Sequence, residues 1–414
     1  MDTLDALELS KMPRLAVLHY ALGRFGGAAK IAILQAIYLN KMGFDVELFY
    51  GGPILNDWKK RVTSEIPVNP LPLGLPKSLQ DIAKITEILS KLRTFDIILV
   101  SYGICPFFAY YLTRFFERKV VWYCGEPLRA LWEDFLSGLS YKSLKCTVKP
   151  TSGFLYGKSY SSIFLSEPLY NSSIRILRAL DIKTIRSYRK IVANSFYTKE
   201  LINRVYHLKG NVFTVHPGID LANFRQVNKT RSIPSDYILA IGAMIPMKNY
   251  TNLLKAFSYL PLQHRSKLKL LIIGDGPLKE AIQSTIQELG LKNNVIITAN
   301  INEDELFCYY KNCRFVIHVA LHEPFGLVPL EAAVFGKTAI VSSIGGPKEF
   351  VVDGQSGILV NPFDPKEIAR AITYFVENEK VAHRMGLKAR DKVVKEFNME
   401  SSSRKLAKTL RSID

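Results

Sequence analysis

Of the 414 residues of the chain, 48% are hydrophobic and 22% are charged, which is typical of a globular protein. The chain is too long for one ordinary core, so two domains are expected. Its formal net charge of +18 indicates an anionic partner, but Lys and Arg are spread along the chain without a helix-turn-helix, RNP or zinc-finger pattern, so no nucleic acid is expected. The five scattered cysteines form no C-x-x-C pair and predict neither a disulfide framework nor a zinc site.

The N-terminus gives no sign of a secretion signal. Its first twelve residues carry acidic side chains and have no apolar h-region. The longest uncharged stretch, Ile97–Thr113, is short for a membrane span and is interrupted by Gly103 and Pro106. We therefore expect a cytoplasmic protein whose contact with a membrane is at most peripheral, on the inner face.

The N-terminal half alternates apolar runs with helix-length amphipathic segments, which predicts a parallel, doubly wound α/β sheet. The predicted strands are Arg14–Tyr20, Asp45–Tyr50, Asp96–Ser101, Lys119–Tyr123, Lys190–Ala193 and Asn211–Val215, with a helix over Ala28–Met42. Between the first strand and this helix, Gly26 and Gly27 would let the backbone approach a phosphate at a helix N-terminus, although any tight turn also uses glycine.

Two features follow the strand that ends at Tyr123. Glu126 lies at the strand end, the usual place for sites in open α/β sheets, and is either a functional carboxylate or a loop residue beside Arg129. Residues 136–188 then break the alternation and are predicted to be an insertion. Seven basic and two acidic residues between Lys158 and Lys190 give a net charge of +5, which indicates an acceptor loop, a membrane-facing surface or a solvated helix.

The Pro217-Gly218 turn dipeptide marks a boundary, so the predicted domains are 1–215 and 216–395, with a final helix in 396–414. The second half again alternates strands and helices. Its predicted strands are Tyr237–Gly242, Lys269–Gly274, Asn294–Ala299, Arg314–Ala320 and Thr338–Ser343, and its predicted helices are Tyr250–Leu260, Pro277–Leu289, Pro365–Asn378, Val381–Phe397 and Met399–Arg411.

Two carboxylates, Glu323 and Glu331, bracket a Phe-Gly turn in the string H-E-P-F-G-L-V-P-L-E-A. Pro329 suits the first position of a helix, which would place Glu331 in the first turn, where free backbone N–H groups favour a phosphate. The segment then offers donors for a diphosphate and acceptors for hydroxyl groups, as a sugar nucleotide requires. The structural alternatives are a capping box for Glu331 and a solvated loop position for Glu323.

The string E-P-F-G-L-V-P-L-E-A, followed after one strand by Gly345-Gly346-Pro347, resembles the donor-site signature of the retaining, GT-B-fold glycosyltransferases of family 4. The resemblance implies two Rossmann-like domains facing across a cleft, an N-terminal one for the acceptor and a C-terminal one for the nucleotide sugar. It implies that the last helix crosses back to the first domain. It also implies transfer of a hexose from a nucleotide-diphosphate sugar to a hydroxyl, with retention at the anomeric carbon and without a bound metal or other cofactor.

The same resemblance implies residue roles. Glu323 would hold donor-sugar hydroxyls and Glu331 the nucleotide ribose, while the N–H groups of Phe325, Gly326 and Leu327 would bind the sugar or the diphosphate. The leaving diphosphate would help to deprotonate the acceptor.

Other positions match the family only in part. In the loop Gly242–Asn249, Lys248 matches a Lys that contacts the diphosphate, but Ala243 stands where an Arg is usual. Gly26 and Gly27 match a glycine loop that meets the donor phosphates. Many relatives carry a His near the position of Gly125, so Glu126 is the local alternative as a catalytic residue, beside Glu323 and Lys248.

The V-P-L-E-A, G-G-P and Y-C-x-E-P stretches look most like mannosyltransferases that build lipid-linked or polysaccharide glycans. The resemblance therefore favours GDP-mannose as the donor and a glycan or lipid-linked acceptor, with an anionic membrane surface as a further partner. A sugar-nucleotide epimerase or a phosphorylase-like enzyme of the same fold is an alternative, although a phosphorylase needs a much longer chain and a pyridoxal-phosphate lysine. A non-catalytic GT-B scaffold or binding subunit is another, which Ala243 and Gly125 favour.

Overall fold

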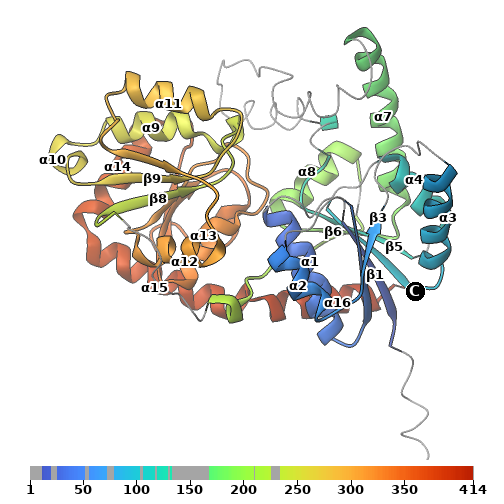
Figure 1. Cartoon of the computed structure of the whole chain (residues 1–414). Coiled ribbons are helices and arrows are strands. Elements are labelled where there is room, and N and C mark those ends of the chain that lie inside the picture. Colours follow the sequence, from blue (N-terminus) through green and yellow to red (C-terminus); the bar gives the residue numbers. More distant parts are fainter. Residues whose placement is uncertain are drawn as a thin grey trace, which may run out of the picture. The chain divides into compact units, whose positions relative to one another are not determined.

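The computed structural model describes residues 12–19, 26–51, 56–71, 79–102, 106–116, 119–128, 131–132, 167–208, 210–224 and 234–413. These residues form two compact units. The first contains the described residues up to 132, those from 167 to Gly218, and Met399 onward, and the second is Ile219–Asn398. Each unit has its own sheet with helices packed around it (Figure 1). Residues 136–166 of the predicted insertion lie outside the described residues.

The sheet of the first unit is parallel, with the strand order β3-β2-β1-β4-β5-β6-β7. Its strands are β1 (Arg14–His19), β2 (Asp45–Gly51), β3 (Val68–Leu71), β4 (Ile97–Ser101), β5 (Val120–Cys124), β6 (Lys190–Ala193) and β7 (Val212–Thr214). The helices are α1 (Gly27–Lys41), α2 (Asn56–Thr63), α3 (Leu79–Leu92), α4 (Pro106–Phe115), α7 (Glu167–Ser187), α8 (Phe196–Tyr206) and α16 (Met399–Arg411).

The sheet of the second unit is also parallel, in the order β10-β9-β8-β11-β12-β13. Its strands are β8 (Tyr237–Ile241), β9 (Lys269–Ile273), β10 (Val295–Thr298), β11 (Val316–His318), β12 (Ala339–Ser342) and β13 (Gly357–Val360). The helices are α9 (Tyr250–Ser258), α10 (Leu262–Arg265), α11 (Lys279–Glu288), α12 (Glu303–Asn312), α13 (Leu327–Val334), α14 (Pro365–Glu377) and α15 (Glu379–Glu396), and the 3₁₀ turns are η1 (Leu221–Phe224), η2 (Pro246–Lys248) and η3 (Gly346–Glu349).

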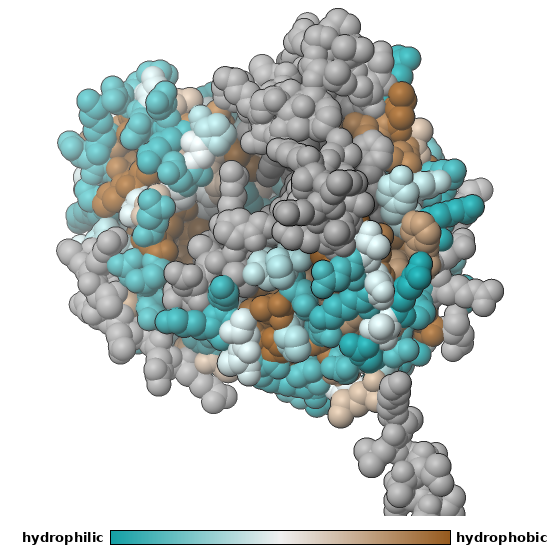
Figure 2. Space-filling model, turned by 45° about the vertical axis from the view of Figure 1, so that its right-hand side comes forward, coloured by the Kyte–Doolittle hydropathy of each residue, from teal (hydrophilic) through white to brown (hydrophobic). Residues whose placement is uncertain are grey.

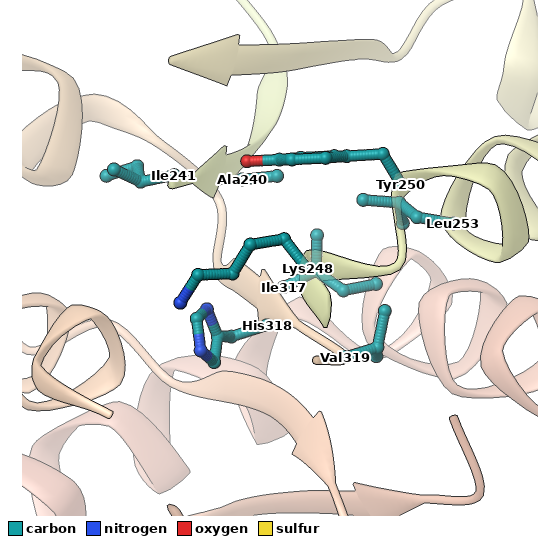
Figure 3. Close-up of a pocket in the computed structure, with 8 residues that line it drawn as sticks. All are labelled: Ala240, Ile241, Lys248, Tyr250, Leu253, Ile317, His318 and Val319. Atoms are coloured by element: carbon teal, nitrogen blue, oxygen red, sulfur yellow. The ribbon is translucent and has the colours of Figure 1, made fainter. Parts of the chain in front are cut away.

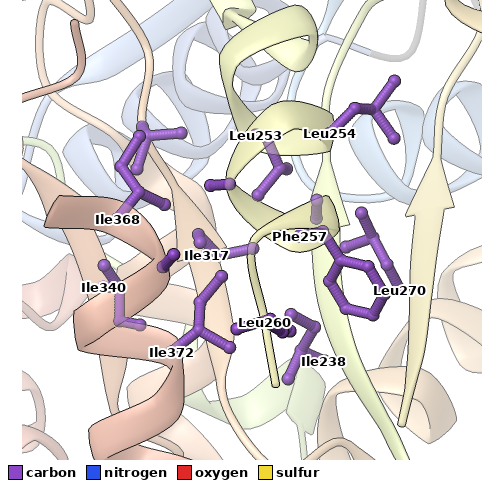
Figure 4. Close-up of a cluster of buried hydrophobic side chains, with 14 of the residues drawn as sticks. Ile238, Leu253, Leu254, Phe257, Leu260, Leu270, Ile317, Ile340, Ile368 and Ile372 are labelled. Carbon is purple, nitrogen blue, oxygen red and sulfur yellow. The ribbon is translucent and has the colours of Figure 1, made fainter. Parts of the chain in front are cut away.

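The second unit is built around two cores, one on each side of its sheet. Successive side chains of a strand point to opposite faces, so Ile238 and Ala240 of β8 enter one core and Tyr237 and Leu239 the other. The first core joins the strands to α9 and α14 (Figure 4). Burial on both faces explains why the strands read as nearly continuous apolar runs. The prediction of doubly wound parallel sheets is confirmed for both units.

The strand orders show where in each sheet the succession of strands reverses, which is the topological switch point. In the second unit β9 and β10 lie on one side of β8, while β11, β12 and β13 lie on the other. In the first unit the same change occurs between β1 and β4. Ligands of open α/β sheets bind outside the carboxyl ends of the strands at such switch points. The ends of β8 and β11 are therefore the first place to look for a site in the second unit.

The last helix, α16, belongs to the first unit although it follows the second in sequence. It packs against α1, and the Arg411 guanidinium donates to the carbonyl of Met42. None of the described helices is long and apolar enough to span a bilayer. On the face shown in Figure 2, hydrophilic side chains cover most of the described surface, and hydrophobic ones are exposed between them in separate groups.

Candidate functional site

The loop after β8 holds the side chain of Lys248. Gly242 has φ +150°, and a Cβ at this position would lie 3.3–3.5 Å from carbon atoms of the Lys248 side chain, so glycine leaves room for that side chain. Asn249 follows with φ +60°, and its side-chain amide donates to the carbonyls of Val319 at 3.0 Å and Pro362 at 2.7 Å. The loop is thereby fixed to the segments that follow β11 and β13.

Glu323 lies after β11 and meets two donors at the same oxygen. The Nζ atom of Lys248 is 2.5 Å from Oε2 of Glu323, and Nε2 of His318, the last residue of β11, is 2.9 Å from it. The side chains of Lys248, Glu323 and His318 are 22%, 14% and 4% exposed. Figure 3 shows the Lys248 and His318 side chains pointing toward the same place from η2 and β11. The switch point of the second sheet therefore carries a half-buried charged cluster.

The charge state of this cluster follows from its geometry. Burial alone would raise the pKa of Glu323, but Lys248 and the hydrogen bond from His318 outweigh it, and the pKa is lowered. Burial lowers the pKa of His318 despite the opposing effect of Glu323. The imidazole is thus neutral near pH 7 and faces an ionised carboxylate, which only accepts hydrogen bonds. The hydrogen must lie on Nε2, and Glu323 receives one charged and one neutral donor.

Close backbone contacts fix the position of Glu323. The Gly346 N–H donates to the Glu323 carbonyl at 2.8 Å. A Cβ on Gly345, which has φ +100°, would come within 2.5 Å of that carbonyl oxygen, and a Cβ on Gly346 would come within 2.2 Å of the Pro324 carbonyl oxygen. The two glycines of the G-G-P turn are needed because the Glu323 loop packs directly on their backbone.

The helix of the signature begins earlier than predicted. It starts at Leu327 with Gly326 as its N-cap, so Pro329 is the third helical residue and Glu331 the fifth. The prediction that Pro329 opens the helix and that Glu331 lies in the first turn is wrong. Proline is tolerated there because the first four N–H groups of a helix have no intrahelical partner. The capping-box alternative for Glu331 is excluded, since no acidic residue lies in the first turn.

Glu331 is nevertheless a buried carboxylate with a defined partner. It is 7% exposed, and the Tyr310 hydroxyl donates to its Oε2 at 2.8 Å. Burial, and then the charge of Glu331, raise the pKa of Tyr310 well above its ordinary value, so this hydroxyl keeps its proton.

At the start of the helix, Phe325 directs its ring into the core beside Phe350 and Phe397, and only its backbone is left for a ligand.

The remaining candidates lie in the first unit. Gly26 is the extended N-cap residue of α1, and both Gly26 and Gly27 are exposed. Glu126 lies two residues beyond the end of β5 and is half-buried. These residues belong to the first unit, whereas Lys248 and Glu323 belong to the second.

The structure explains why residue 125 is glycine. A Cβ on Gly125 would lie 1.8 Å from the ring of Tyr102, which follows β4 with φ +63°. His19, at the end of β1, is buried, has its Nδ1 atom 3.0 Å from the Ser101 carbonyl, and packs edge-on against Tyr102. The aromatic ring thus takes up the space that a larger side chain at position 125 would need.

Sequence reasoning missed two residues that the structure places against the carboxylates, His318 and Tyr310. The only signal for His318 was a polar residue inside the predicted apolar strand Arg314–Ala320. Tyr310 lies on α12, which was not among the predicted helices.

Both halves of the chain match known families. Residues 25–223 match the family described as Glycosyltransferase Family 4, and residues 225–392 match the family described as Glycosyl transferases group 1.

Several curated relatives carry glycosyltransferase names. The chain is 27% identical over 213 residues to an uncharacterized glycosyltransferase of Methanocaldococcus jannaschii (49% of this chain, 54% of the relative). It is 30% identical over 237 residues to a D-inositol 3-phosphate glycosyltransferase of Nocardioides sp. (52% and 51%). It is 26% identical over 250 residues to the alpha-1,3/1,6-mannosyltransferase ALG2 of Dictyostelium discoideum (52% and 59%). The chain spans about half the length of the curated relatives it matches.

Solved structures share the fold over nearly the whole chain. The Anabaena protein HepE, solved in complex with UDP and glucose, has a TM-score of 0.72 at 17% identity, covering 97% of this chain and 100% of HepE. Sucrose-phosphate synthase of Thermosynechococcus elongatus has a TM-score of 0.73 at 16% identity, covering 97% of this chain and 99% of the synthase. At such identities the likeness shows the fold alone, and the expected GT-B fold is confirmed.

Proposed function

Since the chain belongs to the group 1, family 4 glycosyltransferases, we propose that it moves a hexose from a nucleotide-diphosphate sugar to a hydroxyl of a glycan or lipid-linked acceptor, with retention at the anomeric carbon. The observation that carries the proposal is the cluster of Lys248, Glu323 and His318 at the switch point of the second sheet. An ammonium and an ionised carboxylate are together there, as an anionic leaving group and a hydroxyl-rich sugar require.

In this proposal Lys248 neutralises the charge that develops on the leaving diphosphate. An ammonium has three donors, and Glu323 uses one of them in the structure. The start of α13 adds backbone N–H groups from Phe325, Gly326 and Leu327, and the positive end of a helix favours a phosphate. The diphosphate oxygens released by the reaction accept the acceptor's proton, so no protein base is required.

The two carboxylates hold the two ends of the donor. Glu323 accepts hydrogen bonds from sugar hydroxyls, and Glu331, oriented by Tyr310, accepts them from the ribose. In the first unit, the exposed start of α1 at Gly26 and Gly27 offers backbone N–H groups that suit a phosphate. Glu126, beyond the end of β5, offers a carboxylate that can accept a hydrogen bond from a substrate hydroxyl.

Mannose, delivered by GDP-mannose, is the sugar we propose first. The relative ALG2 is named a mannosyltransferase, which supports this choice. HepE was solved with UDP and glucose, so UDP-glucose is the competing donor to test. We propose that the reaction needs no cofactor besides the sugar nucleotide. No group of three or more metal-ligating side chains is present in the described residues.

For the acceptor side we propose peripheral contact with an anionic membrane surface. Part of the basic charge predicted for this role is used internally, because Arg178 donates to the Leu131 carbonyl and Arg186 to the Tyr206 carbonyl. The proposed membrane contact is supported by α4, which packs against α7. Its stacked Tyr111 and Phe115 side chains are 54% and 59% exposed.

Two exposed cations of α7, Arg175 and Lys183, would supply the attraction to such a surface. The protein should bind anionic vesicles more tightly than neutral ones at low salt, by about 1 kcal/mol for each cation that reaches the surface. The double variant Arg175→Glu/Lys183→Glu should lose this preference. Equal binding to both kinds of vesicle, or binding to neither, would refute the membrane contact.

The second candidate is a non-catalytic binding or scaffold subunit, because Ala243 is exposed in the Lys248 loop where relatives carry an Arg. A same-fold epimerase is the third. One experiment separates them. The purified chain is incubated with a panel of nucleotide sugars, and free nucleoside diphosphate, free sugar and epimerised donor are measured.

Release of nucleoside diphosphate that requires Lys248 supports the transferase. Conversion of the donor sugar without such release would identify an epimerase, and donor binding without either reaction would identify a scaffold. The matched control is Lys255→Ala, which removes an exposed lysine of α9 outside the cluster.

A further inference from the structure

His318 is a buried polar residue in a strand that is otherwise apolar. Its side chain is 4% exposed at the end of β11, between a Val-Ile pair and the segment that leads to Glu323. Buried polar groups in proteins are hydrogen-bonded, and a lost partner costs the full penalty of burial. The ring meets this requirement by placing Nε2 2.9 Å from the Glu323 carboxylate.

The two oxygens of Glu323 are not equivalent. Oε2 receives both the Lys248 ammonium and the His318 imidazole. Within the described part of the chain, Oε1 has no hydrogen-bond donor. One oxygen therefore anchors the carboxylate, and the other is left for a ligand.

We propose that His318 is a positioning residue for the transfer reaction. Through Nε2–H it holds Glu323 so that Oε1 accepts a hydroxyl of the donor sugar. This inference rests on the proposed function.

A neutral donor suits this task better than a second cation. As the sugar–phosphate bond breaks, negative charge builds on the diphosphate and attracts the Lys248 ammonium away from Glu323. The neutral imidazole of His318 is not attracted to the diphosphate in this way. Its hydrogen bond to Glu323 therefore persists, and the carboxylate keeps its orientation when Lys248 moves. The ring stays neutral because burial and the adjacent Lys248 both lower the pKa of His318.

The test uses two substitutions of different chemistry. His318→Phe fills the space without a donor, whereas His318→Gln can place an amide N–H close to the position of Nε2. We expect His318→Phe to lower kcat for donor hydrolysis or transfer about ten- to hundredfold, while the affinity for GDP or UDP changes less than about twofold. His318→Gln should restore most of kcat. Thermal unfolding of each variant checks that the fold persists.

The matched control is His264→Phe. His264 makes the same kind of contact, with Nε2 2.9 Å from Oε1 of Glu377, away from the cluster. It should leave kcat unchanged. Wild-type kcat in folded His318→Phe, or equal losses in the Phe and Gln variants, would overturn the inference.

A second measurement does not depend on turnover. The chain has seven histidines, so His318 can be assigned in ¹⁵N-histidine spectra from the signal missing in His318→Gln. We expect a neutral ring protonated on Nε2 at pH 7 whose signal shifts in Glu323→Ala. A ring protonated on Nδ1 alone, or a charged ring, would overturn the inference even if the protein proved inactive. Failure of the wild type to bind or cleave any nucleotide sugar would instead refute the proposed function.

Discussion

Replacing Lys248 with alanine tests whether this lysine acts on the donor or only neutralises Glu323. The substitution removes a donor 2.5 Å from the carboxylate and leaves Glu323 with His318 as its remaining partner among the described residues. It also removes the cation that we assign to the leaving diphosphate. We expect a folded protein that is nearly inactive.

The structure sets the size of both effects. A hydrogen bond to a charged group contributes about 1.5–3 kcal/mol, and because the Lys248 side chain is 22% exposed, water offsets part of its loss. The free energy of unfolding should therefore fall by about 1–2 kcal/mol. Loss of one stabiliser of developing charge typically lowers the rate about 10²–10³-fold, so activity should fall far more than stability.

The assay combines urea unfolding, calorimetric titration with GDP and UDP, and donor cleavage, with Lys255→Ala as the matched control. The double variant Lys248→Ala/Glu323→Gln separates the two roles. Removing the uncompensated carboxylate should recover stability, because no buried charge is then left without its cation. It should not recover affinity for the nucleoside diphosphate. If the double variant binds nucleotide like the wild type, Lys248 acts only on Glu323 and our assignment is wrong.

Three further predictions address neighbouring groups. Glu331→Ala should weaken nucleotide binding about ten- to hundredfold, and Tyr310→Phe should weaken it less, as measured by titration. Equal affinity of the wild type and both variants would reject the role of Glu331 at the ribose. Ala243→Arg should tighten nucleoside-diphosphate binding, and no change would indicate that the loop does not meet a diphosphate. Burial lowers the pKa of His318 below its ordinary value of about 6.5, so the unfolded chain binds this proton more readily than the folded one. The free energy of unfolding should therefore fall more in the wild type than in His318→Gln as the pH falls below about 6.5. If it changes with pH equally in the two proteins, the pKa of His318 is not lowered.

The fold could be predicted from sequence because its strands are buried on both faces. β9 reads K-L-L-I-I and β4 reads I-I-L-V-S, and such runs at regular spacing predict a parallel sheet. The sequence does not predict the shorter or weaker elements. β13 is only four residues long and contains Gly357. α12 is not among the predicted helices, although Asn302 and Glu305 form a capping box at its start.

The site could be predicted in part, for a related reason. Glu323 and Lys248 lie in loops whose glycines form a recognisable pattern, so both residues can be predicted without a structure. The position of His318 in the sequence does not show that its ring turns toward Glu323, because that depends on which strands are neighbours. The start of α13 was misplaced because proline is acceptable anywhere in the first turn, whereas the backbone of Gly326, with φ +93°, decides where the helix begins.

The return of α16 to the first unit has a consequence for synthesis on the ribosome. The helix buries Met399, Leu406 and Leu410 in the first unit, and all the described strands of that unit precede Gly218. At about 5–20 residues per second, roughly 10–40 seconds separate translation of Gly218 from that of Met399. During that time the face of α1 that receives α16 has no covering helix of its own chain. The α16 helix of a completed neighbouring copy can then occupy it, so exchange of this helix between two chains is a route to misassembly.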